Sequence, residues 1–560
     1  MPRRILDRIT APIRGLHQAA YLLAVLTLAS QFLALARDRI FAHTFGAGQI
    51  LDLYYASFRI PDLVFALVSL LVSAYVIIPR ISGMDKEETK KLLSESVTFL
   101  LFAGGVICVF LCIFMPQFLA LLYPNFVASP YHESFVLLSR ILLIQPILLG
   151  ISSIFLSVTQ VQRRFVLVAI SPVLYNLGII IGTVFLYPIY GLPGIGIGVV
   201  IGAVAYLAVH IPVLRVSGVM PSFKMPTLAL MGPVFRNSIP RSLALGMNSV
   251  TILVLISIAS RLGTGEVSVF TFASNLEAVL LALIGSSYAV AAFPALSEAL
   301  AVDKRKEFFE ILSSSARNII LWSIIALGLT AVLRAHIVRI VLGSGAFNWD
   351  ATRLTAAILV ILAVGLVGDA LELLFSRALY AARQSWRPLL YQVATFIVTT
   401  SLAFFFISSH NEWLQKTLDV LLRVSGVPGT PILLIALANI IGQFFLVSLS
   451  LIALRSVAPG LSRSLVRPVI HGSLAAIFGG AAAYGSLFIL GGIAPLTTLS
   501  AVFTQAFVAF VVGSSISALA LYLLKNEEFI GMVNAVDKLL RKRSGRIEVL
   551  APSAEEPLQS

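Results

Sequence analysis

Charged residues are scarce in this 560-residue chain, where aspartate, glutamate, lysine and arginine together make up 12%. Soluble domains carry roughly twice that share, and a soluble chain of this length needs charge to cover the surfaces of several domains. Apolar residues make up 58% of the sequence. The composition therefore excludes a soluble multidomain protein, an intrinsically disordered chain and a coiled coil.

Cysteines and catalytic motifs are scarce as well. Cys108 and Cys112 are the only cysteines, and their spacing of four within an apolar helix favours packing over a disulfide or a metal site. The sequence has no H-E-x-x-H, no phosphate-binding loop and no G-x-S-x-G. The segments between apolar runs are too short to form a catalytic domain. We therefore expect a protein that is not an enzyme and that carries no metal ion or cofactor.

Long apolar runs are what the sequence has in abundance. A run of about 20 apolar residues is long enough to cross a bilayer as a helix. Strands are excluded because the runs are too long and lack strict alternation. Fourteen such runs are present, within residues 19–44, 51–79, 92–120, 134–158, 165–186, 191–214, 238–261, 267–299, 308–343, 354–382, 387–409, 430–454, 467–490 and 494–524.

The positions of the basic residues account for the formal net charge of +14. Thirty of the 40 lysines and arginines lie in the N-terminal segment, in the even-numbered connections between runs or in the C-terminal tail. The odd connections near 121–133, 187–194 and 491–498 have none. Cytoplasmic loops of membrane proteins carry this kind of excess. The pattern predicts a multi-pass membrane protein with both termini in the cytoplasm, and no nucleic-acid partner.

The chain also repeats part of itself at an offset of 217 residues. The segment 46–57 contains Gly-x-Gly followed by Ala-Ser, and 263–274 contains the same residues at the same spacing. A weaker echo pairs Arg163 with Arg383 at an offset of 220. This offset covers six runs, an even number, so both copies enter the membrane in the same direction. The repeats are therefore parallel and related by an axis along the membrane normal.

These observations predict an all-α integral membrane protein of about 14 transmembrane helices. Two parallel six-helix lobes enclose a central cavity, and two extra helices follow them. The predicted parts are a cytoplasmic N-terminus at 1–18, an N-lobe at 19–214, a cytoplasmic linker at 215–237, a C-lobe at 238–454, the two extra helices at 455–524, and a cytoplasmic amphipathic segment with a disordered tail at 525–560.

Polar residues inside the runs mark candidate sites, because a charge at bilayer depth costs roughly 2.5–3.5 kcal/mol. Arg37 lies near the end of the first run, where it can either snorkel to the interface or face the cavity. Arg59 lies deeper, in the second run. The residues that we expect to line the cavity and bind substrate are Arg37, Asp38, Asp52, Arg59, Asp62 and Asn275.

An acidic pair, Asp369 and Glu372, lies three residues apart in the tenth run. Residues at this spacing share one helical face. The pair is a candidate cation or proton site. The alternative is a buried ion pair with an arginine of a neighbouring helix.

One long motif resembles the opening signature of the MurJ (MviN) family of lipid II flippases, within the MOP exporter superfamily. The matching residues read Arg37-Asp38-x-x-x-Ala42-x-x-Phe45-Gly46-Ala47-Gly48-x-x-x-Asp52-x-x-x-x-Ala56-x-x-Arg59-x-Pro61. The fourteen runs, two lobes and two extra helices also resemble this family, so the likeness covers the whole chain.

The resemblance implies movement of the undecaprenyl-pyrophosphate-linked peptidoglycan precursor, lipid II, from the inner to the outer leaflet of the bacterial cytoplasmic (inner) membrane. It implies lipid II or a related polyprenyl-pyrophosphate saccharide as substrate, with membrane lipids and cell-wall synthesis proteins as further partners. No ATP-binding motif is present. The membrane potential or a sodium or proton gradient then has to drive transport.

The sequence departs from the family at three expected cations. Gln31 stands where the family has an arginine, Phe65 lies in the stretch where it has a basic pair, and Asn275 stands at an Asp-Arg pair. Three alternatives to a lipid II flippase follow: a flippase for another polyprenyl-linked saccharide, a MATE-like cation antiporter, and a non-transporting scaffold for cell-wall synthesis.

Overall fold

The computed structural model describes residues 16–68, 74–409, 411–493, 498–534 and 537, and within these ranges every regular element is a helix. The first half contains α2 (Leu16–Phe45), α3 (Gln49–Ser57), α4 (Arg59–Val68), α5 (Ala74–Ile81), α6 (Lys86–Phe99), α7 (Gly105–Leu122), α8 (Pro124–Val127), α9 (His132–Leu142), α10 (Ile144–Val161), α11 (Phe165–Ile181), α12 (Tyr187–Tyr190), α13 (Leu192–Ala208) and α14 (Ile211–Ser217).

The second half continues with longer helices. They are α15 (Leu228–Ala259), α16 (Glu266–Leu281), α17 (Ser287–Ala301), α18 (Arg305–Val341), α19 (Trp349–Ala381), α20 (Trp386–Ser408), α21 (Glu412–Leu421), α22 (Ile432–Leu454), α23 (Leu461–Ser464), α24 (Val466–Ile493) and α25 (Leu499–Leu523). Short π-helical turns at Leu100–Gly104, Gly182–Leu186 and Ala282–Ser286 join consecutive helices into longer rods.

Twelve helices in the described part of the chain are long and apolar enough to cross a membrane. They run from Lys86–Leu122 to Leu499–Leu523 and coincide with the third to fourteenth predicted runs. The first predicted run lies within the single helix α2. The second, 51–79, is divided among α3, α4 and α5, and residues 69–73 lie outside the described ranges. The membrane fold is confirmed, and the count of fourteen spans stays a prediction.

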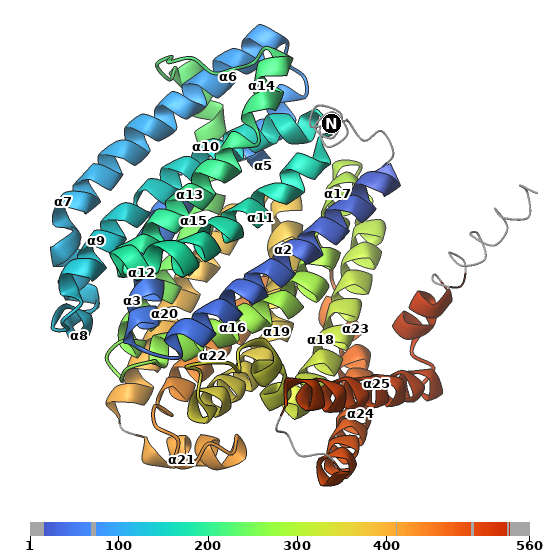
Figure 1. The fold of residues 1–560 in the computed structure, drawn as a ribbon. Coiled ribbons are helices and arrows are strands. Elements are labelled where there is room, and N and C mark those ends of the chain that lie inside the picture. The colour runs from blue at the N-terminus through green and yellow to red at the C-terminus, as the bar shows by residue number, and fades with distance from the viewer. Residues whose placement is uncertain (1–15, 69–73, 410, 494–497, 535–536, 538–560) are drawn as a thin grey trace, which may run out of the picture.

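The helices form two bundles with α2 between them (Figure 1). In the first bundle, α10 and α13 pack against each other and against neighbours that include α4, α9 and α11. In the second, α19 packs against α16, α18 and α22. Helix α2 lies along α11 of the first bundle and also contacts α16 and α18 of the second. Side chains on α2 can therefore reach both lobes.

The backbone shows the internal repeat at its weaker match, the pair Arg163 and Arg383. Arg163 and Arg383 both adopt the left-handed conformation, with φ of 56° and 59°, just after α10 and α19 end. The following residues close the same turn, since Arg164 N donates to Thr159 O at 3.0 Å and Gln384 N donates to Leu379 O at 2.9 Å. This is the usual way to satisfy the last carbonyls of a helix. The two lobes therefore end equivalent helices in the same way.

Glycines allow α11 and α13 to approach closely. A Cβ on Gly198 would meet the backbone of Gly182, and a Cβ on Gly202 would lie 2.5 Å from Tyr175 O. Small residues at a spacing of four are the usual basis of close helix packing in membranes. The interface therefore depends on the absence of side chains at these positions.

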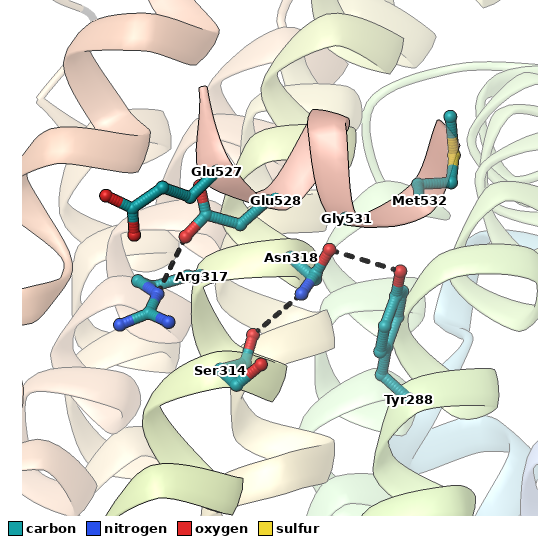
Figure 2. Close-up of a pocket in the computed structure, with 8 residues that line it drawn as sticks. All are labelled: Tyr288, Ser314, Arg317, Asn318, Glu527, Glu528, Gly531 and Met532. Carbon is teal, nitrogen blue, oxygen red and sulfur yellow. Dashed lines mark hydrogen bonds and ion pairs between the residues drawn. The ribbon is translucent and has the colours of Figure 1, made fainter. Parts of the chain in front are cut away.

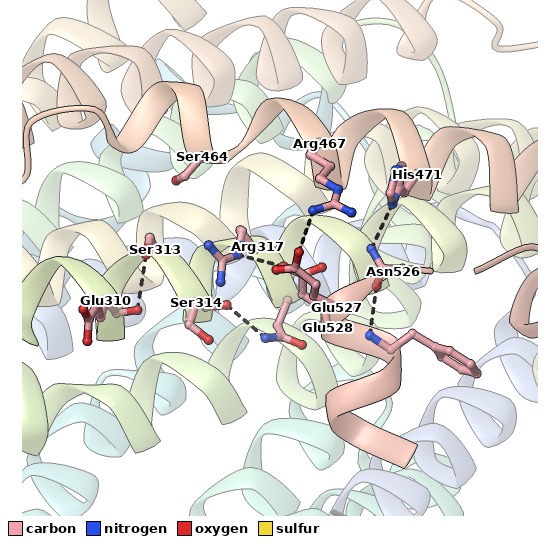
Figure 3. A network of polar contacts seen from close by, with 12 residues as sticks. Glu310, Ser313, Ser314, Arg317, Ser464, Arg467, His471, Asn526, Glu527 and Glu528 are labelled. Carbon is pink, nitrogen blue, oxygen red and sulfur yellow. Dashed lines mark hydrogen bonds and ion pairs between the residues drawn. The ribbon is translucent and has the colours of Figure 1, made fainter. Parts of the chain in front are cut away.

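The last two long helices, α24 and α25, pack on each other and on α18 (Figure 1). A helical segment over 527–534 follows them and is held by ion pairs. Glu528 pairs with Arg317 of α18 at 2.7 Å, and Glu527 pairs with Arg467 of α24 at 2.6 Å (Figure 3). Asn526 lies 3.2 Å from a ring nitrogen of His471.

This segment closes a pocket of about 320 Å³ against α17 and α18 (Figure 2). Tyr288 donates to Asn318 at 3.4 Å on the far wall. The acidic start of the segment is therefore held by arginines of two different helices.

Replacing Gly198 by alanine tests the α11–α13 interface. The added methyl group has to push two backbones apart, and overpacking of this kind costs about 1–3 kcal/mol. We expect a lower thermal midpoint for Gly198→Ala in detergent. Gly105→Ala is the matched control, because nothing lies within 4 Å of that position and alanine is the better helix former. An equal midpoint for the two variants would contradict the packing account.

Candidate functional site

A cluster of four polar side chains joins α2 to both lobes. Arg37 donates through Nε and Nη2 to Asp38 Oδ1 at 3.0 and 2.8 Å, and through Nη1 to Asn176 Oδ1 of α11 at 3.0 Å. The second oxygen of Asp38 accepts from Asn275 Nδ2 of α16 at 2.9 Å. Three predicted site residues therefore meet in one network, which we call the arginine cluster: Arg37, Asp38, Asn176 and Asn275.

The geometry of α2 explains the position of Arg37. The residue lies eight positions before the helix ends at Phe45, which is about 12 Å along an α-helix. Its guanidinium lies 5.9 Å from the centroid of the Phe41 ring, one turn further on. The side chain is 19% exposed, whereas that of Asp38 is 3% exposed. Arg37 is therefore held inside the protein and does not lie at the end of its helix.

The Arg37 guanidinium keeps unused donors. Three of its N–H groups bind Asp38 and Asn176, and its remaining N–H groups bind no other described residue. An arginine oriented on one side by a carboxylate and free on the other can bind a carboxylate or a phosphate. This is the arrangement expected of an anion-binding arginine.

Arg59 and Asp62 share a face of α4, as their spacing predicts. Their charged atoms are 3.9 Å apart, a long ion pair. The Arg59 side chain is 17% exposed, and its buried Nε has no hydrogen-bond partner in the described residues. A buried, under-bonded guanidinium requires a ligand or water. Arg59 is therefore a second candidate for anion binding.

Tyr55 and Asn176 belong to the site and escaped the sequence prediction. Tyr55 lies within electrostatic range of both Arg37 and Arg59, and its buried hydroxyl has no hydrogen-bond partner in the described residues. Asn176 holds Nη1 of Arg37. Asn176 is the only amide side chain in the run 165–186, and that was the available signal. Nothing local distinguishes Tyr55 from a packing tyrosine.

Asp52 lies apart from this cluster and caps a helix of the other lobe. Its carboxylate accepts from Gly265 N at 2.5 Å, from Ser268 N at 2.8 Å and from Ser268 Oγ at 2.5 Å. The first N–H groups of a helix have no partner within the helix, and an acidic side chain satisfies them. Asp52 comes from α3 and the helix is α16, so the cap crosses between lobes.

The two halves of the sequence repeat meet at this cap. Gly265 has a φ of 92°, and a Cβ there would lie 2.5 Å from Ala47 O. Gly46 has a φ of 62°, and a Cβ there would lie 2.6 Å from Ala346 O. Both positions require glycine for conformation and for space. We call this region, where 43–52 contacts 263–268 and 343–347, the gate.

Further bonds hold the gate together. Ala346 N donates to His43 O at 3.0 Å, and Arg39 Nη1 donates to Ile340 O at 2.6 Å. Ser257 Oγ of α15 donates to Leu122 O at the end of α7 at 2.5 Å. The lobes are therefore joined at this end of the molecule by charged, backbone and side-chain hydrogen bonds.

The acidic pair of α19 lies within the second lobe. Glu372 is 9% exposed and accepts from Ser450 Oγ of α22 at 2.8 Å. Glu277 of α16 is 8% exposed, lies within electrostatic range of Asp369, and has one buried oxygen with no described partner. No ion pair to either residue of the pair occurs among the described residues. The alternative of a structural ion pair is therefore without support here.

Comparison with known families decides the relationship. Residues 41–414 match the family model described as lipid II flippase MurJ. The chain belongs to the MurJ family. The lipid II flippase MurJ of Burkholderia cenocepacia is 26% identical over 402 residues, covering 69% of this chain and 77% of that protein. The probable lipid II flippase MurJ of Thermotoga maritima is 27% identical over 367 residues, covering 65% and 73%.

Solved structures agree with this fold. A lipid II flippase MurJ in an inward closed conformation superposes with a TM-score of 0.68 at 19% identity, over 90% of this chain and all of the other. An inward-facing multidrug resistance transporter of the MATE family and the MOP superfamily gives 0.62 at 15% identity, over 78% of this chain and 98% of the other. The chain therefore shares its fold with both of these transporters.

The structure shows the surroundings of the three positions that depart from the MurJ pattern. Asn275, at the position of an expected Asp-Arg pair, donates to Asp38 and so links the lobes. Gln31 of α2 and Phe65 of α4 are partly buried. Arg140 of α9 donates through Nε to Cys112 O of α7 at 2.9 Å, a contact within the first lobe.

Removing the interlobe cap tests the gate. Asp52→Ala leaves the N–H groups of Gly265 and Ser268 unsatisfied, and loss of an N-cap costs about 1–2 kcal/mol. We expect the gate to open more often, by a factor of about ten per 1.4 kcal/mol. The measurement is the distance distribution between spin labels at the exposed positions Thr44 and Thr264, with Cys108 and Cys112 replaced.

Asp350→Ala is the control for this experiment. Asp350 lies in the first turn of α19 and forms no described ion pair. The distances should stay short in this variant. Equal distributions in Asp52→Ala and the unchanged protein would contradict the role of Asp52 in closing the gate.

Proposed function

We propose that this protein moves lipid II, the polyprenyl-pyrophosphate-linked peptidoglycan precursor, from the inner to the outer leaflet of the bacterial cytoplasmic membrane. The observation that carries the proposal is the Arg37 guanidinium, oriented by Asp38 between the two lobes with N–H donors to spare. Arg59 supplies a second under-bonded cation. A pyrophosphate group presents several anionic oxygens, which are the acceptors that such donors bind best.

The orientation follows from the basic residues. The connections at the gate carry few of them, while the opposite connections hold most of the lysines and arginines. By the positive-inside rule the gate faces outward and both termini lie in the cytoplasm. In this orientation the described conformation is closed toward the outside.

Alternating access then requires the gate and part of the arginine cluster to separate. The bonds from Asp38 to Asn275 and from Asp52 to Ser268 cross between lobes. A headgroup phosphate that binds the spare N–H groups of Arg37 shares the guanidinium with Asp38, the residue whose other oxygen accepts from Asn275. Movement of the anion outward is favoured by about 2.3 kcal/mol per charge for each 100 mV of membrane potential.

Loss of Arg37 tests this function. Arg37→Ala removes hydrogen bonds to charged phosphate oxygens, each worth about 1.5–3 kcal/mol. We expect transport to fall by about a hundredfold or more, and we expect the variant to fail to rescue bacteria depleted of their own lipid II flippase. Arg37→Lys keeps the charge but loses the forked geometry, and it should rescue weakly.

Arg339→Gln is the control, since Arg339 lies 5.8 Å from the centroid of the Trp349 ring and is not one of the residues of the arginine cluster. It should rescue fully. If the unchanged chain expresses in the membrane but does not rescue, the substrate is another saccharide lipid or the protein is a scaffold. Rescue by Arg37→Ala would remove Arg37 from the substrate site.

We further propose that Asp369 and Glu372 bind the coupling ion, a proton or a sodium ion. Three observations favour this assignment: neither residue has a paired cation among the described residues, Glu372 is buried, and one oxygen of Glu277 has no described partner. Such a site links the second lobe to an ion gradient without ATP.

Glu372→Gln tests this site. Glutamine still accepts from Ser450 but carries no charge, so we expect transport of a labelled lipid substrate in proteoliposomes to become independent of an imposed proton or sodium gradient. Glu298→Gln, at an exposed position of α17, should keep the gradient dependence of the unchanged protein. A full gradient response in Glu372→Gln would exclude the acidic pair as the coupling site.

A further inference from the structure

Two hollows flank α15. In Figure 1, α7, α15 and α20 lie on the side of the molecule away from α24 and α25. The first is a groove of about 630 Å³ between α4, α7 and α15, and every residue that lines it is apolar. The second is a pocket of about 560 Å³ between α15 and α20, and it contains an arginine and several hydroxyl groups. Both volumes lie in the range of roughly 300–1,000 Å³ that is usual for ligand sites.

The groove is open to the surrounding lipid. Val106 and Phe110 of α7 are 57% and 52% exposed, and Leu121 at the end of that helix is 72% exposed. Leu67 of α4 and Leu253 of α15 complete its walls. A hydrocarbon chain fits such a surface, whereas a polar ligand finds no hydrogen-bond partner there.

The pocket supplies a cation with no counter-ion. Arg261 is exposed and makes one long hydrogen bond, from Nη2 to Leu121 O at 3.5 Å. No acidic side chain of the described residues pairs with it. Thr400 and Ser401 of α20 face it across the pocket, with the apolar side chains of Phe404 and Ile407 beside them. A pocket with an arginine bordered by apolar side chains suits an amphiphile better than a soluble anion.

The two hollows meet at Arg261. Its guanidinium donates to Leu121 O, and the side chain of Leu121 lines the groove. Ser257, which lines the pocket, donates through Oγ to Leu122 O. Leu253 and Val254 are consecutive on α15 and line the groove and the pocket respectively. A single molecule with an anionic head and an acyl chain can therefore occupy both.

We propose that this surface binds one anionic glycerophospholipid, with its phosphate on Arg261 and an acyl chain in the groove between α4 and α7. The site lies beside the gate and against α4, the helix that carries Arg59. It is distinct from the arginine cluster, and its existence does not depend on the transported substrate.

Native mass spectrometry of the full-length protein in detergent tests the site. Phosphatidylglycerol is added, and phosphatidylethanolamine with the same chains serves as the lipid control. Arg261→Gln should weaken the binding of phosphatidylglycerol about tenfold, the effect of losing about one charge-assisted hydrogen bond, and should leave phosphatidylethanolamine unchanged. Arg261→Lys should keep most of the preference. Arg353→Gln, at another arginine that donates to a carbonyl, should behave like the unchanged protein.

Filling the groove gives an independent readout. Val106→Trp at a lipid-exposed position should weaken both lipids. Unchanged binding of phosphatidylglycerol to Arg261→Gln would overturn the headgroup assignment, as would an equal loss of both lipids. Unchanged binding to Val106→Trp would overturn the chain assignment. Displacement of phosphatidylglycerol by a lower concentration of undecaprenyl phosphate would assign the surface to a polyprenyl chain instead.

Discussion

The carboxylate of Asp38 is the contact on which the site depends, because it serves two purposes at once. One oxygen orients Arg37 and the other accepts from Asn275 of the second lobe. It is almost fully buried, and a buried charge is stable only with such partners. The proposed anion-binding cation and the junction between the lobes therefore share one residue.

The buried carboxylate of Asp52 also joins the two lobes, at the gate. Asp52 takes the position of a capping residue for α16, although it belongs to the other lobe. Capping groups are normally local, and their loss merely frays a helix end. Here the cap can be broken by moving one lobe, at a cost of about 1–2 kcal/mol.

Asn275 shows how this chain differs from the MurJ pattern at one of the missing cations. An arginine at that position would stand beside Arg37 and compete for Asp38, whereas the asparagine amide donates to Asp38 without charge. The cluster therefore has fewer cations than the family pattern and is held more tightly by neutral amides, Asn176 among them.

The sequence by itself determined the membrane class, the extents of the third to fourteenth runs and the presence of a repeat. Hydrophobicity, length and glycine spacing are local properties, so they can be read without knowing any contact. It also singled out Arg37, Asp38 and Asn275, because charge and amide groups are rare at such depth. Only the tertiary structure decided their partners. Asn176 lies 139 residues from Arg37, and Ser268 lies 216 residues from Asp52. The pairing of these polar side chains depends on how α2, α11 and α16 pack against one another. That packing is set by the whole bundle.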